Sequence, residues 1–97
     1  MGTKRSQVDI LLDVLRVIEL GTTKPTRIMY RANLSGTPLI RLLEKCVDNG
    51  LICVERVRRG QRMDRRYSIT EKGREVLEAY QDLFAFLREM EIKLQEA

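Results

Sequence analysis

The spacing of apolar residues predicts a helix at the start of the chain. Between residues 7 and 20 apolar side chains recur every three or four positions, which is the period of one helix face. Ser6 is placed to cap the first turn, with Asp9 three residues further on. Gly21 follows the last apolar residue and suits the left-handed backbone that ends many helices. We therefore expect a first helix over about 7–20.

Two further helices are expected before Gly50, joined by a Ser-Gly turn. Residues 26–33 form a short helical segment, and Pro25 before it suits a first helical turn. The next helix, of about twelve residues, has Ser35 or Thr37 as its cap and Gly50 as its end. A short helix, a tight turn and a longer helix together are the pattern of a helix-turn-helix.

The longer of these two helices has an apolar face for the core and a polar face for solvent. On the polar face Arg41 suits bidentate contact to guanine, and Thr37 and Lys45 suit contact to phosphate. Glu44 and Asp48 on the same face would be repelled by phosphate. The helix therefore offers few base-reading groups, and backbone binding is favoured over sequence reading.

After Gly50 the period of the pattern changes from that of a helix to that of a strand. Residues 51–57 are β-branched and apolar, and residues 66–70 alternate apolar with polar side chains. Between them lies RVRRGQRMDRR (56–66), with Gly60 at a turn. We expect a β-hairpin whose loop is this arginine run. A hairpin with a basic tip directly after a helix-turn-helix is the arrangement of a winged helix.

The last predicted helix runs from a Thr70 cap to the end of the chain, about 40 Å at 1.5 Å per residue. Its apolar residues are spaced 4, 3, 4, 3, 4, which is the alternation of coiled-coil a and d positions. The preceding domain can cover only its first turns, so we expect a second copy to cover the rest. The alternative is a helix folded back on its own domain. The predicted dimer interface consists of Val76, Tyr80, Leu83, Phe84, Leu87, Met90 and Leu94.

The charge is concentrated in the arginine run. The chain has 97 residues with 18 Lys and Arg against 14 Asp and Glu, yet residues 1–55, 56–66 and 67–97 carry +2, +5 and −3. All six bases of the middle segment are arginines, which pair with phosphate in a bidentate way and enter narrow minor grooves. The alternative is that these arginines pair with Glu55, Asp64 or a neighbouring acidic helix.

Composition also argues against several classes of function. The chain has no His, and Cys46 and Cys53 do not form a CxxC pair, so we expect no metal site and interpret both as buried thiols. We find no nucleophile or phosphate-loop motif, and expect neither enzyme activity, nor a cofactor, nor a small-molecule substrate. No apolar stretch approaches the roughly 18 residues of a membrane span and no secretory signal is recognisable, so a cytoplasmic, nucleoid-associated protein without a membrane partner is expected.

Several of these segments together carry a family likeness. The run TRIMYRANLS (26–35), the turn DNGLI (48–52), the hairpin end YSIT (67–70) and EKGREVL (71–77) resemble the small archaeal winged-helix DNA-binding proteins typified by the 10a protein of Sulfolobus. The likeness covers nearly the whole chain. In that family the carboxy-terminal helices pair as an antiparallel coiled coil, and the dimer binds duplex DNA with little or modest sequence preference.

The resemblance implies a mainly α fold with a small β-hairpin (α+β). Residues 1–70 would form a winged helix-turn-helix domain, and residues 71–97 a coiled-coil helix that makes a homodimer. The resemblance places four side chains of the third helix on the DNA-facing side: Thr37, Ile40, Arg41 and Lys45. The hairpin would be the wing, longer and richer in arginine than is usual in the family, with six arginines expected to contact DNA: Arg56, Arg58, Arg59, Arg62, Arg65 and Arg66.

The expected function is binding of double-stranded DNA, mainly through phosphate, as an architectural, chromatin-like protein or a transcription regulator. Wings at the two ends of an antiparallel rod would contact separate turns of one duplex or bridge two duplexes. The alternative is a protein-interaction adaptor whose terminal helix recruits a different helix. Met63 near the wing tip is interpreted either as a wedge between bases or simply as an exposed side chain.

Overall fold

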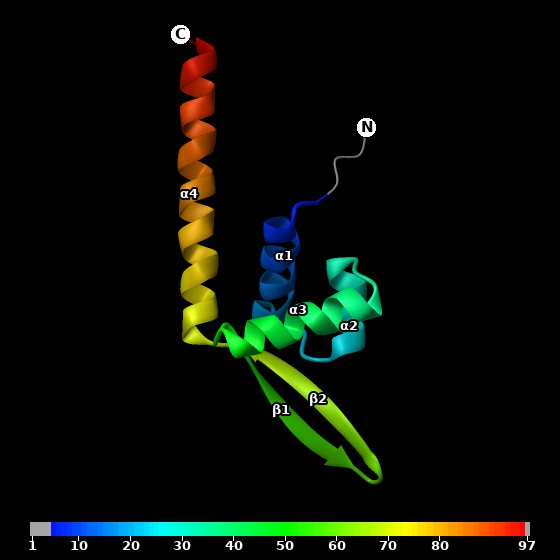
Figure 1. Ribbon diagram of the computed structural model, residues 1–97. Helices are drawn as coiled ribbons and strands as arrows, with labels where there is room; N and C mark the ends of the chain where they lie inside the picture. Colours follow the sequence, from blue (N-terminus) through cyan, green and yellow to red (C-terminus); the bar gives the residue numbers. More distant parts are fainter. Residues whose placement is uncertain (1–4, 97) are drawn as a thin grey trace.

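The computed structural model describes residues 5–96, which form three helices, a hairpin and a long final helix (Figure 1). This architecture confirms the predicted fold class, mainly α with a small β-hairpin. The first two helices lie within one residue of their predicted bounds. The elements are α1 (Gln7–Glu19), α2 (Pro25–Ala32), α3 (Gly36–Asp48), β1 (Ile52–Arg59), β2 (Arg62–Ile69) and α4 (Glu71–Glu96).

Helix α1 begins with the capping box that its sequence predicts. The Ser6 hydroxyl accepts a hydrogen bond from the Asp9 N–H, and the Ser6 N–H donates to the Asp9 carboxylate, both at 3.1 Å. Hydrogen bonds between the Asp9 carboxylate and Ser6, chiefly the one from the Ser6 backbone N–H, lower the pKa of Asp9 below its ordinary value. Because the pKa is lowered on folding, their contribution to stability is present above that ordinary value and is lost as the pH falls through the folded pKa. Gly21 follows the helix with φ +104°, as expected.

The core lies where α1, α2 and α3 meet the base of the hairpin and the first turns of α4. Arg5 fixes the turn between α2 and α3 from outside: its guanidinium donates to Ala32 O and Asn33 O, each at 2.6 Å, and pairs with Asp13 of α1 at 3.0 Å. Asn33 has a left-handed backbone with φ 54°. The buried apolar residues are Leu12, Val14, Leu15, Ile18, Ile28, Ala32, Leu39, Leu43, Cys46, Ile52, Tyr67 and Leu77.

The two cysteines differ in exposure, so the prediction that both are buried is wrong for Cys53. Cys46 is 2% exposed in the core, and burial raises the pKa of its thiol to about 11. Cys53 lies on β1 between Ile52 and Val54, which point toward the core, so its own side chain points the opposite way. It is exposed, with its Sγ 3.0 Å from the Ser68 Oγ.

We expect one of the two thiols to react in the native protein. With an aromatic disulfide at neutral pH, Cys53 should react within seconds to minutes, whereas Cys46 is shielded and forms little thiolate. Absorbance of the released thiol should count about one group per native chain and about two in denaturant. Cys53→Ser should remove the fast phase. Two equally fast groups in the native protein would contradict the assignment.

The arginine run forms most of the hairpin strands, which corrects the prediction that it is the loop. Ile52 pairs with Ile69 at the base and Arg59 pairs with Arg62 at the tip, so the turn consists of Gly60 and Gln61 alone. Gly60 has φ +59°, the backbone that tight hairpin turns require. A two-stranded ribbon beyond the core has solvent on both faces, so charged side chains carry no burial cost there.

Helix α4 is fastened to the domain at its first turn and then leaves it (Figure 1). The Thr70 hydroxyl accepts a hydrogen bond from the Gly73 N–H at 3.0 Å and donates to Gly50 O at 2.6 Å, which confirms the predicted cap. Leu77 is 2% exposed, and Val76 and Tyr80 pack at the edge of the core. Beyond this point the helix extends along the 64 Å axis of the molecule.

The outer half of α4 is open to solvent, so the alternative of a helix folded back on its own domain is wrong. Residues 81–95 are all exposed, including Leu87 at 53% and Leu94 at 72%. The exposed large apolar side chains on this half are Leu83, Phe84, Phe86, Leu87, Met90, Ile92 and Leu94.

Gly73→Ala is expected to destabilise the fold by about 2 kcal/mol or more. A Cβ at Gly73 would collide with Leu51 O and would lie 2.8 Å from Ile69 Cγ1. The Leu51 carbonyl is held in place because it accepts from the Thr70 N–H at 3.1 Å. Urea unfolding followed by circular dichroism measures the change. The matched control is Gly36→Ala, whose Cβ would meet only Met29 Sδ at 4.0 Å. Equal stability of the two variants would contradict the proposed collision.

Candidate nucleic-acid interface

The two strands of the hairpin present arginines on both faces, because side chains alternate along each strand and paired residues share a face. One face continues the side of the hairpin that packs on the core, and we call it the α3-side face. The register places Arg56, Arg58, Met63 and Arg65 on it. The opposite face carries Glu55, Arg59, Arg62, Asp64 and Arg66.

Most of the wing charge is available to a ligand. Within residues 5–96, Arg59 is the wing arginine that forms an ion pair, with its Nε 3.3 Å from the Asp64 carboxylate. The alternative, in which the wing arginines form ion pairs with acidic residues of the same chain, therefore holds for one arginine of six. Met63 is 62% exposed near the tip, on the face that also holds Arg58.

The polar face of α3 is exposed as predicted, but its cations are not directed at the wing. Arg41 and Lys45 line a hollow with α1 residues, on the side of α3 that includes Pro38. Glu44 and Asp48 instead line a hollow of about 190 Å³ against the α3-side face of the hairpin. The two predicted basic sets are therefore separated by a pair of carboxylates. All four predicted third-helix residues are exposed: Thr37, Ile40, Arg41 and Lys45.

The segment leading into α2 lies along β2, a placement that the sequence does not predict. The Tyr67 N–H donates to Thr23 O at 2.9 Å, so this segment extends the hairpin at the edge of β2. As a result Lys24 and Thr26 line a hollow together with wing residues. No local signal marks this contact, because the two segments are distant in sequence.

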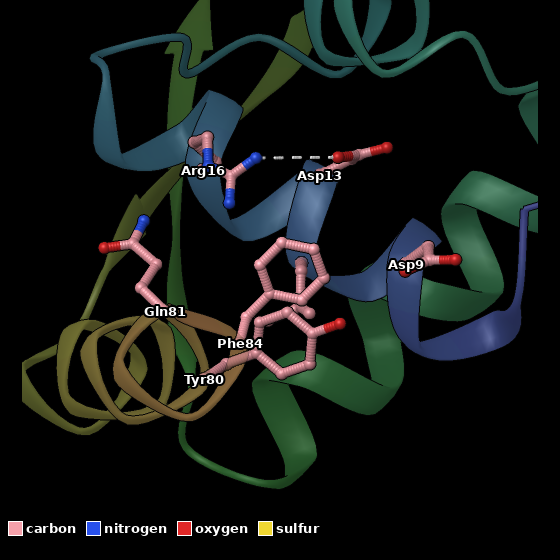
Figure 2. A pocket seen from close by; sticks show the side chains of 7 residues that line it. Asp9, Asp13, Arg16, Tyr80, Gln81 and Phe84 are labelled. Atoms are coloured by element: carbon pink, nitrogen blue, oxygen red, sulfur yellow. Dashed lines mark ion pairs between the residues drawn. The ribbon is translucent and has the colours of Figure 1, made fainter. Parts of the chain in front are cut away.

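Two of the predicted dimer-interface residues also form part of a small hollow between α1 and α4. Figure 2 shows the rings of Tyr80 and Phe84 on α4 facing α1, where Asp13 and Arg16 are 3.9 Å apart. The two rings are stacked with centroids 6.1 Å apart, and the Arg88 guanidinium lies 5.8 Å from the centre of the Phe84 ring. The hollow has a volume of about 210 Å³. We use "seam" for the six predicted a and d residues of α4: Val76, Tyr80, Leu83, Leu87, Met90 and Leu94. The first turns of the α4 seam are thus partly covered by the protein's own domain.

The described part of the chain also bears on metal binding and on membrane insertion. Among residues 5–96, no cluster of three or more Cys, Asp or Glu side chains is arranged to hold a metal ion. No helix in the same range is both long and apolar enough to cross a membrane. The arginine hairpin is the chemically distinctive feature of this surface.

Comparison with known proteins identifies the architecture. A family model described as winged helix-turn-helix matches residues 4–88. The chain belongs to this family. Over 84 aligned residues, this winged helix is 27% identical to protein MJ0287 of Methanocaldococcus jannaschii. The aligned region covers 87% of this chain and 78% of the relative.

Two solved structures whose own descriptions mention DNA share this fold. Sso10a-2, described as a DNA-binding protein from Sulfolobus solfataricus, is 25% identical with a TM-score of 0.68, covering 95% of this chain and 90% of that chain. Bacillus subtilis PadR, solved in complex with operator DNA, is 16% identical with a TM-score of 0.68, covering 74% of this chain and 46% of that chain. The similarity to Sso10a-2 confirms the predicted resemblance to the 10a proteins of Sulfolobus.

Proposed function

We propose that this winged helix binds double-stranded DNA as a homodimer, mainly through phosphate contacts from the wing. The observation that carries the proposal is the hairpin itself, which extends beyond the core with five of its six arginines outside any ion pair in the described residues. Arginine guanidinium groups with this exposure suit phosphate oxygens and narrow grooves. The DNA-binding descriptions of Sso10a-2 and PadR support the same function.

The proposed contacts favour binding with little sequence preference. On α3 the strong base reader is Arg41, with Ile40, Thr37 and Lys45 beside it, and the carboxylate of Glu44 lies on the same exposed surface. We therefore propose an architectural, nucleoid-associated role. The alternative role is transcription regulation, and an enriched binding motif would indicate it. Selection from a random duplex library separates these two, because only a regulator enriches a motif.

The experiment that tests DNA binding is titration of a fluorescent 30-base-pair duplex followed by anisotropy. We expect binding at about 50 mM salt and a log–log salt slope near −7, as about four phosphate contacts from each of two wings require. Absence of binding by a homogeneous preparation at this salt would contradict the proposal.

We further propose that α4, within the proposed dimerisation segment 71–97, pairs with the same helix of a second copy, leaving residues 1–70 as the DNA-binding part. In an antiparallel pair whose two-fold axis crosses at Ala85, all six a and d residues of the seam find partners. The matched layers are Val76 with Leu94, Tyr80 with Met90, and Leu83 with Leu87 of the partner. The exposure of the outer seam supports this proposal. A stable monomer would instead favour the adaptor function, in which the seam recruits a different helix.

A further inference from the structure

A basic hollow of about 620 Å³ lies between the start of α2 and the wing. Lys24 and Thr26 line it on the α2 side, and Arg62, Arg65 and Arg66 line it on the β2 side. No residue of α2 belongs to the DNA-binding set predicted from the sequence. This hollow therefore extends the basic surface beyond the wing arginines to the residues at the start of α2.

The two walls of the hollow are held at a fixed separation. The hydrogen bond from the Tyr67 N–H to Thr23 O joins the residue before Lys24 to β2, and Tyr67 itself is buried. On the other side Ile28, one turn into α2, is fully buried in the core. The backbone segments on the two sides of the hollow are therefore fixed relative to each other, and their Lys and Arg side chains line the space between them.

The charge of this hollow differs from that on the α3-side face of the wing. Five cations line it, and its single carboxylate, Asp64, is already paired with Arg59. The hollow against α3 instead sets Glu44 and Asp48 against Arg56 and Arg65. A phosphate group is therefore attracted to the hollow beside α2 and meets two carboxylates in the hollow beside α3.

Hydrogen-bond donors without acceptors also mark the hollow. The Lys24 side chain does not cap α2, and Pro25 occupies the first position, so the N–H groups of the first turn keep no helical acceptor. Among residues 5–96, Arg66 Nε is the buried side-chain nitrogen that lacks a hydrogen-bond partner. Because this Nε is enclosed, the Arg66 guanidinium offers an anion in the hollow only its terminal nitrogens.

We infer that this hollow binds a phosphodiester group of the duplex backbone, with Lys24, Arg62 and Arg66 as its cationic partners. The inference rests on the proposed function and adds the side from which DNA approaches the wing. The duplex contacts the wing on the side of α2, not on the side of Glu44 and Asp48. The wing arginines then contribute unequally, and Arg62 contributes more than Arg56.

Charge-matched variants of the 97-residue chain test the assignment by duplex titration across salt concentrations. Lys24→Gln and Arg62→Gln remove exposed cations from the hollow, and Arg56→Gln removes one from the α3-side face. Each hollow variant is expected to flatten the log–log salt slope by about 2 per dimer, since one phosphate contact is lost from each copy. Arg56→Gln should change it by less than about 1. The Thr26 amide resonance should shift on addition of duplex and only weakly on addition of inorganic phosphate at matched ionic strength.

The possible outcomes separate this inference from the proposed function. If the wild type binds duplex but Arg56→Gln flattens the slope as much as Lys24→Gln and Arg62→Gln, the hollow is not the phosphate site and DNA binding stands. An equally strong shift of the Thr26 amide by inorganic phosphate would make the hollow a site for free anions and overturn the duplex assignment. A wild type that does not bind duplex at all overturns both.

Discussion

Alanine at Arg58, Arg59, Arg62 and Arg65 together is expected to lower affinity for duplex DNA at least 100-fold at about 100 mM salt. In the proposed dimer this change removes about eight phosphate contacts, so the log–log salt slope should flatten from near −7 to above about −2. All four side chains lie beyond the core on exposed strands, and only Arg59 is engaged in an ion pair within residues 5–96. The free energy of unfolding should therefore change by less than about 1 kcal/mol.

A control variant that loses the same number of positive charges elsewhere shows whether affinity depends on contacts from the wing or only on the net charge of the protein. Removing an equal number of bases from α4 should reduce affinity less than about fivefold, because screening leaves little attraction from charges far from the duplex. Unchanged affinity in the wing variant, or equal losses in the two variants, would show that the wing is not the binding surface. The α4 control replaces Lys72, Arg74, Arg88 and Lys93 with alanine.

Leu83→Glu combined with Leu87→Glu is expected to convert a dimer into a monomer. In the proposed register these two residues face each other across the two-fold axis, so the change places four carboxylates in two adjacent layers of the seam. Both side chains are 53% exposed in the single chain, so the domain itself should stay folded. Sedimentation should give a dimer for the wild type and a monomer for the variant at about 10 µM, and duplex affinity should fall by about 100-fold as the two wings act separately.

The matched control for this variant is Ala85→Glu combined with Ile92→Glu, which adds the same two charges per chain to the same helix on the side away from the seam. It should remain a dimer with wild-type affinity. Dissociation of this control would show that the seam does not define the interface. A wild type that sediments as a monomer at about 100 µM would contradict the dimer and favour the adaptor function.

Local signals in the sequence were sufficient to predict the helices. Ser6, Pro25 and Gly50 mark ends that depend on neighbouring residues only, and Thr70 caps α4 by the same logic. The hairpin was placed correctly but its loop was not, because a run of arginines resembles a solvated loop whether or not its backbone is paired. Exposure at a strand position depends on which face packs on the core, which explains the error at Cys53.

The arrangement of the candidate site depends on contacts between distant segments. The separation of Arg41 from the wing by Glu44 and Asp48 follows from how α3 is rotated against the hairpin, and helical periodicity alone does not specify that rotation. Lys24 reaches the wing because Thr23 pairs with Tyr67. Such a pairing is set by the packing of the whole domain.

The length of the hairpin has a consequence for the protein in the absence of DNA. The two eight-residue strands pair with each other, and β2 makes one further hydrogen bond at its base, from the Tyr67 N–H to Thr23 O. Backbone N–H and C=O groups therefore stay open along β1 and along the outer part of β2. Edges of this kind recruit strands from other molecules and cause aggregation. Arginines on both strands keep a second wing at a distance through like-charge repulsion. The residues proposed to hold DNA therefore also keep the unbound protein dispersed, and raising the salt concentration weakens both effects together.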